Sequence, residues 1–82
     1  MTFTIAINVM PLNDLLDPQG KAVLAGLHNL GLKNTEDVRI GKRITLHIAA
    51  ASEQEAIAIA KEAAEKLLAN QVMEQFEISV IG

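Results

Sequence analysis

Apolar and polar residues alternate through the middle of the chain and keep one phase on both sides of Gly41-Lys42, and this alternation constrains the fold more than any other feature. The apolar side chains of the segment all occupy even positions: Val38, Ile40, Ile44, Leu46 and Ile48. Polar or charged residues fill most of the odd positions, and such a period of two is typical of a strand with one buried face. A single strand over 36–49 would be about 45 Å long at about 3.3 Å per residue.

A hairpin is the alternative interpretation of this segment. A two-residue loop at Gly41-Lys42 would pair Ile40 with Arg43 on one face, which breaks the apolar pattern. A three-residue loop over 41–43 would preserve the pattern, but it would place glycine first, whereas the common turn of this length has glycine last. We favour one long strand that bends or bulges at Gly41.

Two shorter strands are predicted near the ends of the chain, over 3–9 and 76–80, where apolar residues again alternate. Pro11 ends the first, because proline has no N–H to donate to a sheet, and a loop over 12–16 follows. Each strand is about half as long as the middle one, which leaves backbone groups of the middle strand unpaired. Such an edge favours pairing with another chain, and we predict a homodimer or homotetramer. The oligomer-interface candidates are Val38, Ile40, Ile44, Leu46 and Ile48.

Two helices are predicted between the strands. Asp17 is the expected N-cap of the first helix, with Pro18 at its first position, and Gly31 is expected to end it in a left-handed conformation. Ser52 begins a capping box with the glutamate three residues later. The second helix is expected to run to Asn70, as a second left-handed terminator.

The element order and the single apolar face of each element together predict the fold class. We expect an α+β two-layer sandwich in which both helices cover one face of a mainly antiparallel three-stranded sheet. This β-α-β-α-β arrangement is a variant of the ferredoxin-like fold. Residues 1–82 are expected to form a single domain.

Composition excludes several classes of site. The chain has no cysteine, which excludes disulfides, thiolate metal sites and cysteine nucleophiles. Its only aromatic residues are two phenylalanines, and its net charge is −3, so neither base stacking nor phosphate contacts are favoured. No leader is apparent, and no apolar run approaches the roughly 20 residues of a membrane span. We expect a soluble cytoplasmic protein that binds neither nucleic acid nor membrane.

Three cations gather around one glycine in the middle segment. Arg39, Lys42 and Arg43 flank Gly41, and glycine allows the backbone to approach a ligand closely. The cluster could bind an anion or an acidic patch on a partner. It could equally be an edge strand that charge protects from aggregation, and both interpretations stay open.

The other polar candidates have simpler explanations. The segment around Gln19 and Gly20 is explained as a helix start, although free N–H groups there could receive an anion or a carbonyl. His28 and His47 have no partners at the spacing of a metal or catalytic site. We interpret each histidine as a surface or interface residue.

Four motifs in combination resemble one known family. They read D-P-Q-G-K-A-V over 17–23, L-G over 30–31, D-V-R-I-G-K over 37–42 and L-L-A-N over 67–70. Together they resemble the PurS family, the small subunit of phosphoribosylformylglycinamidine (FGAM) synthase, over nearly the whole chain. The sequence departs from that family at Gln71, where members commonly have proline, and at Phe76, where they often have tyrosine. The loop before Asp17 is also longer and less basic than in the family.

The resemblance implies a non-catalytic assembly subunit. In this family's complex, a glutaminase (PurQ) releases ammonia, and a synthetase (PurL) uses ATP to activate the amide oxygen of formylglycinamide ribonucleotide, which becomes FGAM. The small subunit, as a dimer, joins the two and helps to form a closed route for ammonia. ATP and Mg²⁺ would then be used by the synthetase, and we expect no catalytic residue, cofactor or metal on this chain.

The resemblance and the residue-level interpretation together select the partner-interface candidates. These are Asp17, Pro18, Gln19, Gly20, Arg39, Gly41, Lys42 and Asn70. The competing hypothesis is a regulatory module of ferredoxin-like type that binds a small molecule at a dimer interface. A stand-alone enzyme is disfavoured, because no acid, base or nucleophile occurs at convergent spacing.

Overall fold

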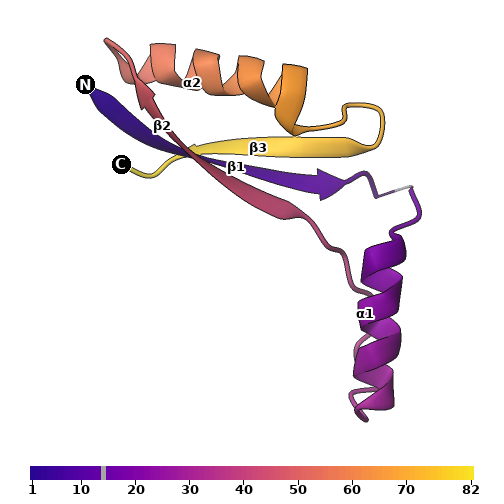
Figure 1. Ribbon diagram of the computed structural model, residues 1–82. Coiled ribbons are helices and arrows are strands. Elements are labelled where there is room, and N and C mark those ends of the chain that lie inside the picture. The colour runs from indigo at the N-terminus through magenta and orange to yellow at the C-terminus, as the bar shows by residue number, and fades with distance from the viewer. Residues whose placement is uncertain (14) are drawn as a thin grey trace.

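The computed structural model describes residues 1–13 and 15–82, so Asp14, in the predicted loop over 12–16, lies outside the described residues. The elements are β1 (Thr2–Pro11), α1 (Pro18–Asn29), β2 (Lys42–Ala49), α2 (Glu53–Ala63), a π-helical turn η1 (Ala64–Leu68) and β3 (Glu74–Val80). The predicted β-α-β-α-β order is confirmed (Figure 1). No described helix combines the length and the apolar character that crossing a membrane requires.

The sheet is antiparallel, and β1 is its central strand. The strand order is β2-β1-β3, so β2 and β3 are both edges. Ile7 sits at the middle of the register, opposite Ile44 on one side and Ile78 on the other. The three predicted apolar faces therefore lie together on one side of the sheet, as a period of two requires.

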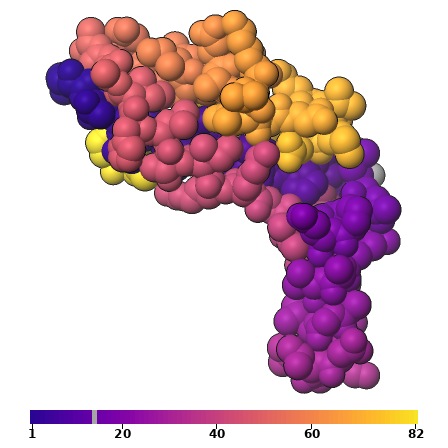
Figure 2. Space-filling model, in the orientation of Figure 1, coloured from indigo at the N-terminus to yellow at the C-terminus, as the bar shows by residue number. Residues whose placement is uncertain are grey.

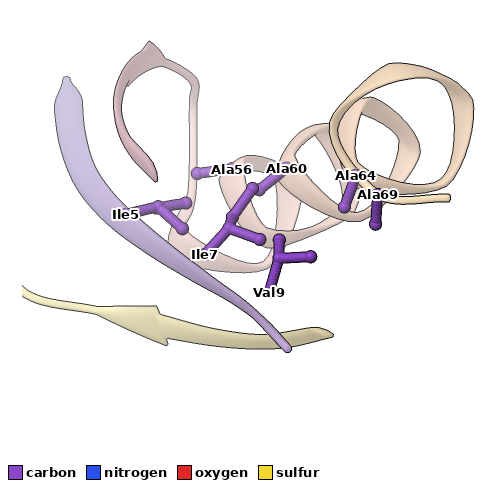
Figure 3. Close-up of a cluster of buried hydrophobic side chains, with 7 residues drawn as sticks. All are labelled: Ile5, Ile7, Val9, Ala56, Ala60, Ala64 and Ala69. Atoms are coloured by element: carbon purple, nitrogen blue, oxygen red, sulfur yellow. The ribbon is translucent and has the colours of Figure 1, made fainter. Parts of the chain in front are cut away.

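The core lies between this apolar face and α2. Ile5, Ile7 and Val9 of β1 are completely buried, and Figure 3 shows them pointing toward the alanines of α2 and η1. These alanines are Ala56, Ala60 and Ala64, all with no exposed surface. Their small side chains allow the helix to approach the sheet closely, while the branched side chains of β1 fill the space between the layers.

Among the described residues only one helix, α2, covers the sheet, so the prediction of two helices on one face is corrected for α1. Figure 1 shows α1 projecting from the end of the sheet, and Gly20 is its only buried residue. Three strands about 4.8 Å apart make a surface that one helix about 10 Å wide largely covers. The segment 30–41 runs back beside α1. We call residues 18–41 the arm; Figure 2 shows it beyond the body of the molecule.

The middle strand is shorter than predicted and is not a hairpin. The ladder with β1 stops at the pair of Val9 and Lys42, and residues 36–41 have no strand assignment. On the far side of Gly41 from β2, the side chain of Arg39, instead of a backbone ladder, contacts the carbonyls of Pro11 and Leu12. The predicted strand was too long because the alternation of apolar and polar residues extends through residues 36–41, which lie outside the sheet.

The helix ends agree with the sequence at three of four positions. Asp17 and Ser52 cap α1 and α2 through their side chains, and Gly31 has a φ of 91°. Asn70 is different, because among the described residues no residue other than glycine has a positive φ. Its side-chain Oδ1 accepts a hydrogen bond from the N–H of Val72 at 3.1 Å, so it forms an Asx turn instead.

Candidate partner-binding site at the base of the arm

The carboxylate of Asp17 joins the start of α1 to the segment that enters β2. Its Oδ1 accepts a hydrogen bond from the N–H of Gly20 at 3.0 Å, and its Oδ2 accepts one from the N–H of Ile40 at 2.8 Å. These two N–H groups, helped by the nearby Arg39 cation, hold the pKa of Asp17 below its ordinary value despite burial. Asp17 therefore connects two segments of the chain as well as capping α1. We call Asp17, Gly20, Arg39 and Gly41, which hold these segments together, the clasp.

The guanidinium of Arg39 fastens the loop after β1 to the same segment. Its Nη2 donates to the carbonyl of Leu12 at 2.6 Å and to that of Pro11 at 3.2 Å. Its Nη1 donates to the carbonyl of Asn13 at 3.4 Å. Most of its hydrogen-bonding capacity is thus used inside the chain, which argues against Arg39 as the free anion-binding cation of the cluster.

Two glycines allow the backbone to close around this clasp. A Cβ on Gly20 would collide with the carbonyl oxygen of Val38, and one on Gly41 would collide with the carbonyl of Val9 and the sulfur of Met10. Glycine is required at both positions because another segment of backbone occupies the space of a side chain. Gly20 and Gly41 therefore serve the fold of the arm base.

A pocket of about 360 Å³ opens beside the clasp. Residues from four parts of the chain line it. These parts are the end of β1 with the loop after it, the first turn of α1, the segment before β2 at Ile40, and the turn that leads into β3. They include Leu16, Pro18, Gln19, Asn70 and Met73. Leu16 and Met73 are 64% and 51% exposed, so the pocket has an uncovered apolar rim.

The structure divides the predicted partner-interface candidates into two groups. Asp17, Gly20, Arg39 and Gly41 are engaged in the clasp, while Pro18, Gln19 and Asn70 line the pocket. Lys42 is exposed at the end of β2, opposite Val9 on the side of the sheet that faces α2. The sequence motifs thus converge on one region of the described chain, where the residues of the second group and Lys42 have exposed side chains.

The predicted oligomer-interface residues also fall into two groups. Ile44, Leu46 and Ile48 lie half-buried against the core cluster. Val38 and Ile40 lie half-buried in the arm, outside the sheet. Residues 36–41 are therefore the part of the predicted strand that lies outside the sheet.

The chain is similar to known proteins in both sequence and fold. Residues 4–82 match the family model described as "PurS: Phosphoribosylformylglycinamidine (FGAM) synthase". The chain belongs to the PurS family. It is 38% identical to the PurS subunit of Bacillus subtilis over 95% of this chain and 92% of the relative. It is 40% identical to the PurS subunit of Mycobacterium leprae over 89% of each chain.

Solved PurS structures have the same architecture. A chain in the structure of PurLQS from Thermotoga maritima superposes with a TM-score of 0.91, at 31% identity over 99% of each chain. PurS of Bacillus subtilis superposes with a TM-score of 0.85 at 36% identity, over 98% of this chain and 99% of that one. The fold of this chain, including its projecting arm, is thus that of the PurS family.

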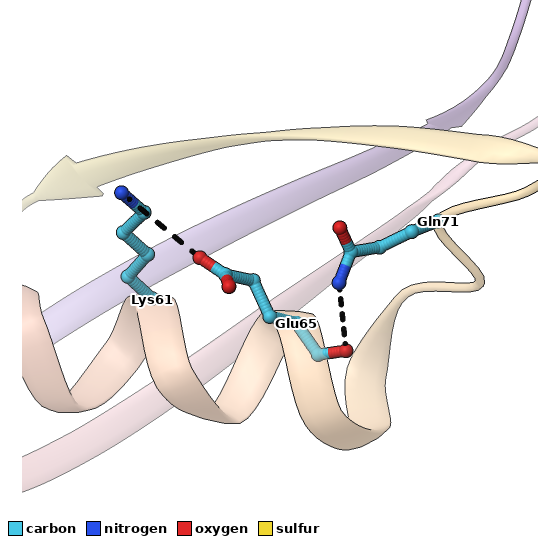
Figure 4. A network of polar contacts seen from close by, with 3 residues as sticks. All are labelled: Lys61, Glu65 and Gln71. Atoms are coloured by element: carbon cyan, nitrogen blue, oxygen red, sulfur yellow. Dashed lines mark hydrogen bonds and ion pairs between the residues drawn. The ribbon is translucent and has the colours of Figure 1, made fainter.

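Gln71, where the family commonly has proline, helps to close the end of the helical segment. Its Nε2 donates to the carbonyl of Glu65 at 3.0 Å, and the Glu65 side chain lies 4.0 Å from the ammonium of Lys61 (Figure 4). The amide satisfies a carbonyl that the end of a helix leaves free. Phe76, the other departure, lies half-buried against the core opposite Val9, on the face that α2 covers.

Sequence reasoning missed the apolar part of the site. Leu16 and Met73 were not singled out, because a leucine in a loop and a methionine before a strand are each common. Val72, which is 81% exposed and directly precedes Met73, was also missed. The sequence did contain an indication of this surface, because these apolar residues lie outside the predicted strands and helices that form the core.

The histidines and carboxylates of the described residues do not gather into a metal-ligand cluster. No group of three His, Asp or Glu residues among them could hold a metal ion. His28 contacts the carbonyl of Thr35 through Nε2 at 2.8 Å, and His47 contacts Thr4 Oγ1 through Nδ1 at 3.1 Å. Apolar, amide and prolyl groups dominate the site, and such groups are suited to protein contacts.

Proposed function

We propose that this chain is the small assembly subunit of an FGAM synthase, the ATP- and glutamine-dependent enzyme of purine biosynthesis that converts formylglycinamide ribonucleotide to FGAM. The chain would hold a glutaminase, PurQ, beside a synthetase, PurL. The observation that carries the proposal is the match to the PurS family over residues 4–82. The similar Thermotoga maritima chain belongs to a structure of PurLQS, which supports these two partners.

The proposal assigns the chemistry to the partners. ATP and Mg²⁺ would be bound by the synthetase, and this chain would contribute contacts without a cofactor of its own. Its contacts would help to enclose the path that ammonia takes between the two large subunits, where contact with water would otherwise dissipate it. A cytoplasmic location remains a prediction of the same proposal.

The partner contacts are proposed at the pocket and its exposed surroundings. Pro18, Gln19 and Asn70 line the pocket together with uncovered apolar side chains, and Lys42 is exposed near the arm base. An apolar centre with a polar border is the usual make-up of a protein interface. Asp17, Gly20, Arg39 and Gly41 would act indirectly by holding this surface in shape.

A homodimer or homotetramer is part of the proposal. Residues 36–41 are extended, and they have no ladder partner among the described residues. Val38 and Ile40 in this segment would offer apolar side chains to a second copy, and the edge strands β2 and β3 would offer backbone groups. Residues Ile44, Leu46 and Ile48 would support such an interface from inside the core.

The second candidate function is a small-molecule regulatory module. The pocket volume of about 360 Å³ lies at the low end of the range of ligand sites, and this observation favours it. A thermal-shift screen of amino acids and nucleotides separates the two functions, because a ligand that binds the native state raises its stability. The assembly proposal predicts no shift from any of them when the chain is alone.

The main test compares two glutamines at equivalent helix positions. Gln19 is the second residue of α1 and lines the pocket, whereas Gln54 is the second residue of α2, and both are exposed. We expect Gln19→Arg to reduce the glutamine-dependent turnover of the reconstituted complex by about tenfold or more, as for a central interface residue. Gln54→Arg should leave it unchanged.

Co-purification and an ammonia assay complete this test. The chain is expressed with PurL and PurQ, and complex formation is measured with nucleotide and glutamine present. Ammonia-dependent turnover should fall less than glutamine-dependent turnover in Gln19→Arg. Equal turnover in both glutamine variants would rule out the pocket as a contact surface, and failure of all three proteins to associate would refute the assembly function itself.

A further inference from the structure

The arm meets the rest of the molecule at its base. We call residues 1–11 and 42–82, which contain the sheet and α2, the body. Figure 1 shows α1 standing off the end of the sheet, and within the described chain neither the strands nor α2 pack extensively against it. The direction in which the arm points is therefore set by contacts at the base, because the rest of α1 has no extensive packing that could set it.

Arg39 connects the arm to the end of β1. Its guanidinium donates to the carbonyls of Pro11, Leu12 and Asn13, with donor–acceptor distances between 2.6 and 3.4 Å. The Nε of the same side chain is shielded from solvent and has no acceptor among the described residues. A buried N–H without an acceptor is unfavourable, so the contacts of the two terminal nitrogens must outweigh this cost. They fix the returning segment of the arm relative to β1.

The backbone of Leu12 extends this connection to the opposite edge of the sheet. Its carbonyl accepts from Nη2 of Arg39 at 2.6 Å, while its N–H donates to the carbonyl of Met73 at 2.9 Å. Met73 belongs to the turn that leads into β3, where its own N–H and that of Glu74 both donate to the carbonyl of Asn70. A continuous series of hydrogen bonds thus joins the arm to the turn that carries Asn70 and Met73.

The pocket beside the clasp lies across this connection. Pro18 and Gln19 line it from the arm, whereas Asn70 and Met73 line it from the body. The separation of these two halves depends on the direction of the arm. A rigid connection prepares both halves for a partner, because binding then removes less conformational freedom.

We propose that Arg39 is a positioning residue that fixes the direction of the arm and, through the backbone of Leu12, the separation of the two halves of the pocket. Arg39 acts on the turnover of the complex through this geometry and touches no substrate. Asp17 has a different task, because its carboxylate joins α1 to Ile40 at the arm base. The inference rests on the proposed function only for its effect on turnover, since the geometry belongs to the isolated chain.

The direct test measures the distance between the arm and the body by double electron–electron resonance. The natural chain has no cysteine, so Asn29→Cys in α1 and Gln54→Cys in α2 place two spin labels at exposed positions. An excess of unlabelled chain restricts the measurement to distances within one chain. We expect Arg39→Ala to make the distance distribution at least about twofold broader, because no other extensive packing orients α1.

Arg43→Ala is the matched control. Arg43 is the only other arginine of the chain, and it is exposed on β2, so its removal should leave the distance distribution unchanged. Arg39→Lys is the second variant, for use if circular dichroism shows that Arg39→Ala unfolds. It keeps the charge but replaces the planar fork of donors by one ammonium, and its distribution should also be broader than the natural one. A distribution as narrow as the natural one in every folded Arg39 variant would overturn the proposal.

Free guanidinium tests the contact without a side chain. The ion can donate to the three carbonyls that Arg39→Ala leaves unpaired, and about 50 mM is far below the molar concentrations that unfold domains. Sodium chloride at the same concentration controls for ionic strength. Guanidinium, and not sodium, should narrow the distribution of Arg39→Ala toward the natural one. Equal effects of the two salts would contradict the assignment of these carbonyls to the guanidinium group.

The reconstituted complex with PurL and PurQ supplies the functional readout. Arg39→Ala should lower glutamine-dependent turnover by about tenfold or more, since a misplacement of about 1 Å can cost up to about 100-fold. Guanidinium should restore part of this loss and leave the natural complex unchanged, which a role in stability alone does not predict. A broad distribution with natural turnover would refute the positioning role and leave the assembly function standing. Failure of the natural chain to associate with PurL and PurQ would refute the assembly function and leave the distance test valid.

Discussion

At the scale of single residues, the motif positions of this chain serve the fold before they serve a partner. Asp17 accepts hydrogen bonds from Gly20 and Ile40, and Arg39 holds three consecutive carbonyls of the preceding loop. Removing either side chain would leave buried donors or acceptors unsatisfied, which destabilises a protein more than the loss of an exposed hydrogen bond. Substitutions at these positions therefore change the arm base itself.

The lowered pKa of Asp17 predicts an acid-sensitive contribution to stability. Its folded pKa lies below the ordinary value of 3.8, so the unfolded chain binds the proton more tightly. The stabilisation is fully present above that value and is lost as the pH falls through the folded pKa. We expect Asp17→Asn to lower the free energy of unfolding at neutral pH and to weaken its decline below pH 4.

Urea unfolding measured between pH 2 and pH 7 checks this prediction. Asp37→Asn is the control, since Asp37 is exposed and forms no side-chain hydrogen bond with the described part of the chain. If the free energy of unfolding falls equally steeply with decreasing pH in the natural chain and in Asp17→Asn, then protonation of Asp17 does not contribute to the acid sensitivity of the fold.

At the scale of elements, one alanine-rich helix supports the whole sheet. α2 contacts all three strands, and its buried positions are alanines. Close packing of this kind leaves little space for a larger side chain. Because α2 lies close to the sheet, it contacts all three strands by itself. α1 is therefore not needed to cover the sheet and can project from its end.

Enlarging one of these alanines should separate the layers. We expect Ala60→Leu, at a fully buried position, to destabilise the chain by about 1–3 kcal/mol through overpacking. Ala58→Leu, on the exposed side of the same helix, should change stability by less than about 0.5 kcal/mol. Urea unfolding of both variants provides the measurement, and equal effects would contradict the assigned helix face.

At the scale of the whole molecule, the chain is far from compact. Its radius of gyration is 16.1 Å and its longest dimension is 51 Å, whereas a compact domain of this length has a radius near 12 Å. The arm leaves Val23 and Leu30 exposed at 42% and 78%. A shape that exposes so much apolar surface is typical of a subunit completed by other chains.

The arm should therefore be the least protected part of the isolated chain. We expect backbone amides of α1 to exchange with solvent at least about 100-fold faster than those of β1, because α1 has few buried contacts. Addition of PurL and PurQ should slow exchange in α1. Hydrogen–deuterium exchange with mass spectrometry measures both, and α1 protection equal to that of β1 in the dilute chain would refute a free arm.

The sequence by itself determined the features that depend on neighbours along the chain. Alternation placed the strands, Asp17 and Ser52 marked the helix starts, and Gly31 marked a left-handed end. The motifs from 17 to 70 also selected the residues that the fold gathers at the arm base. Local hydrogen bonds and side-chain periodicity act over a few residues, and so they are readable from order alone.

Only the tertiary structure decided what each apolar stripe faces. Both helices have an apolar stripe, yet α1 projects and α2 covers the sheet. The reason is that a three-stranded sheet has room for one helix. Alternation through Gly41 could not reveal that the ladder ends at Lys42, where the side chain of Arg39 replaces backbone pairing. The pocket arises from residues far apart in the sequence, and their proximity depends on the complete fold.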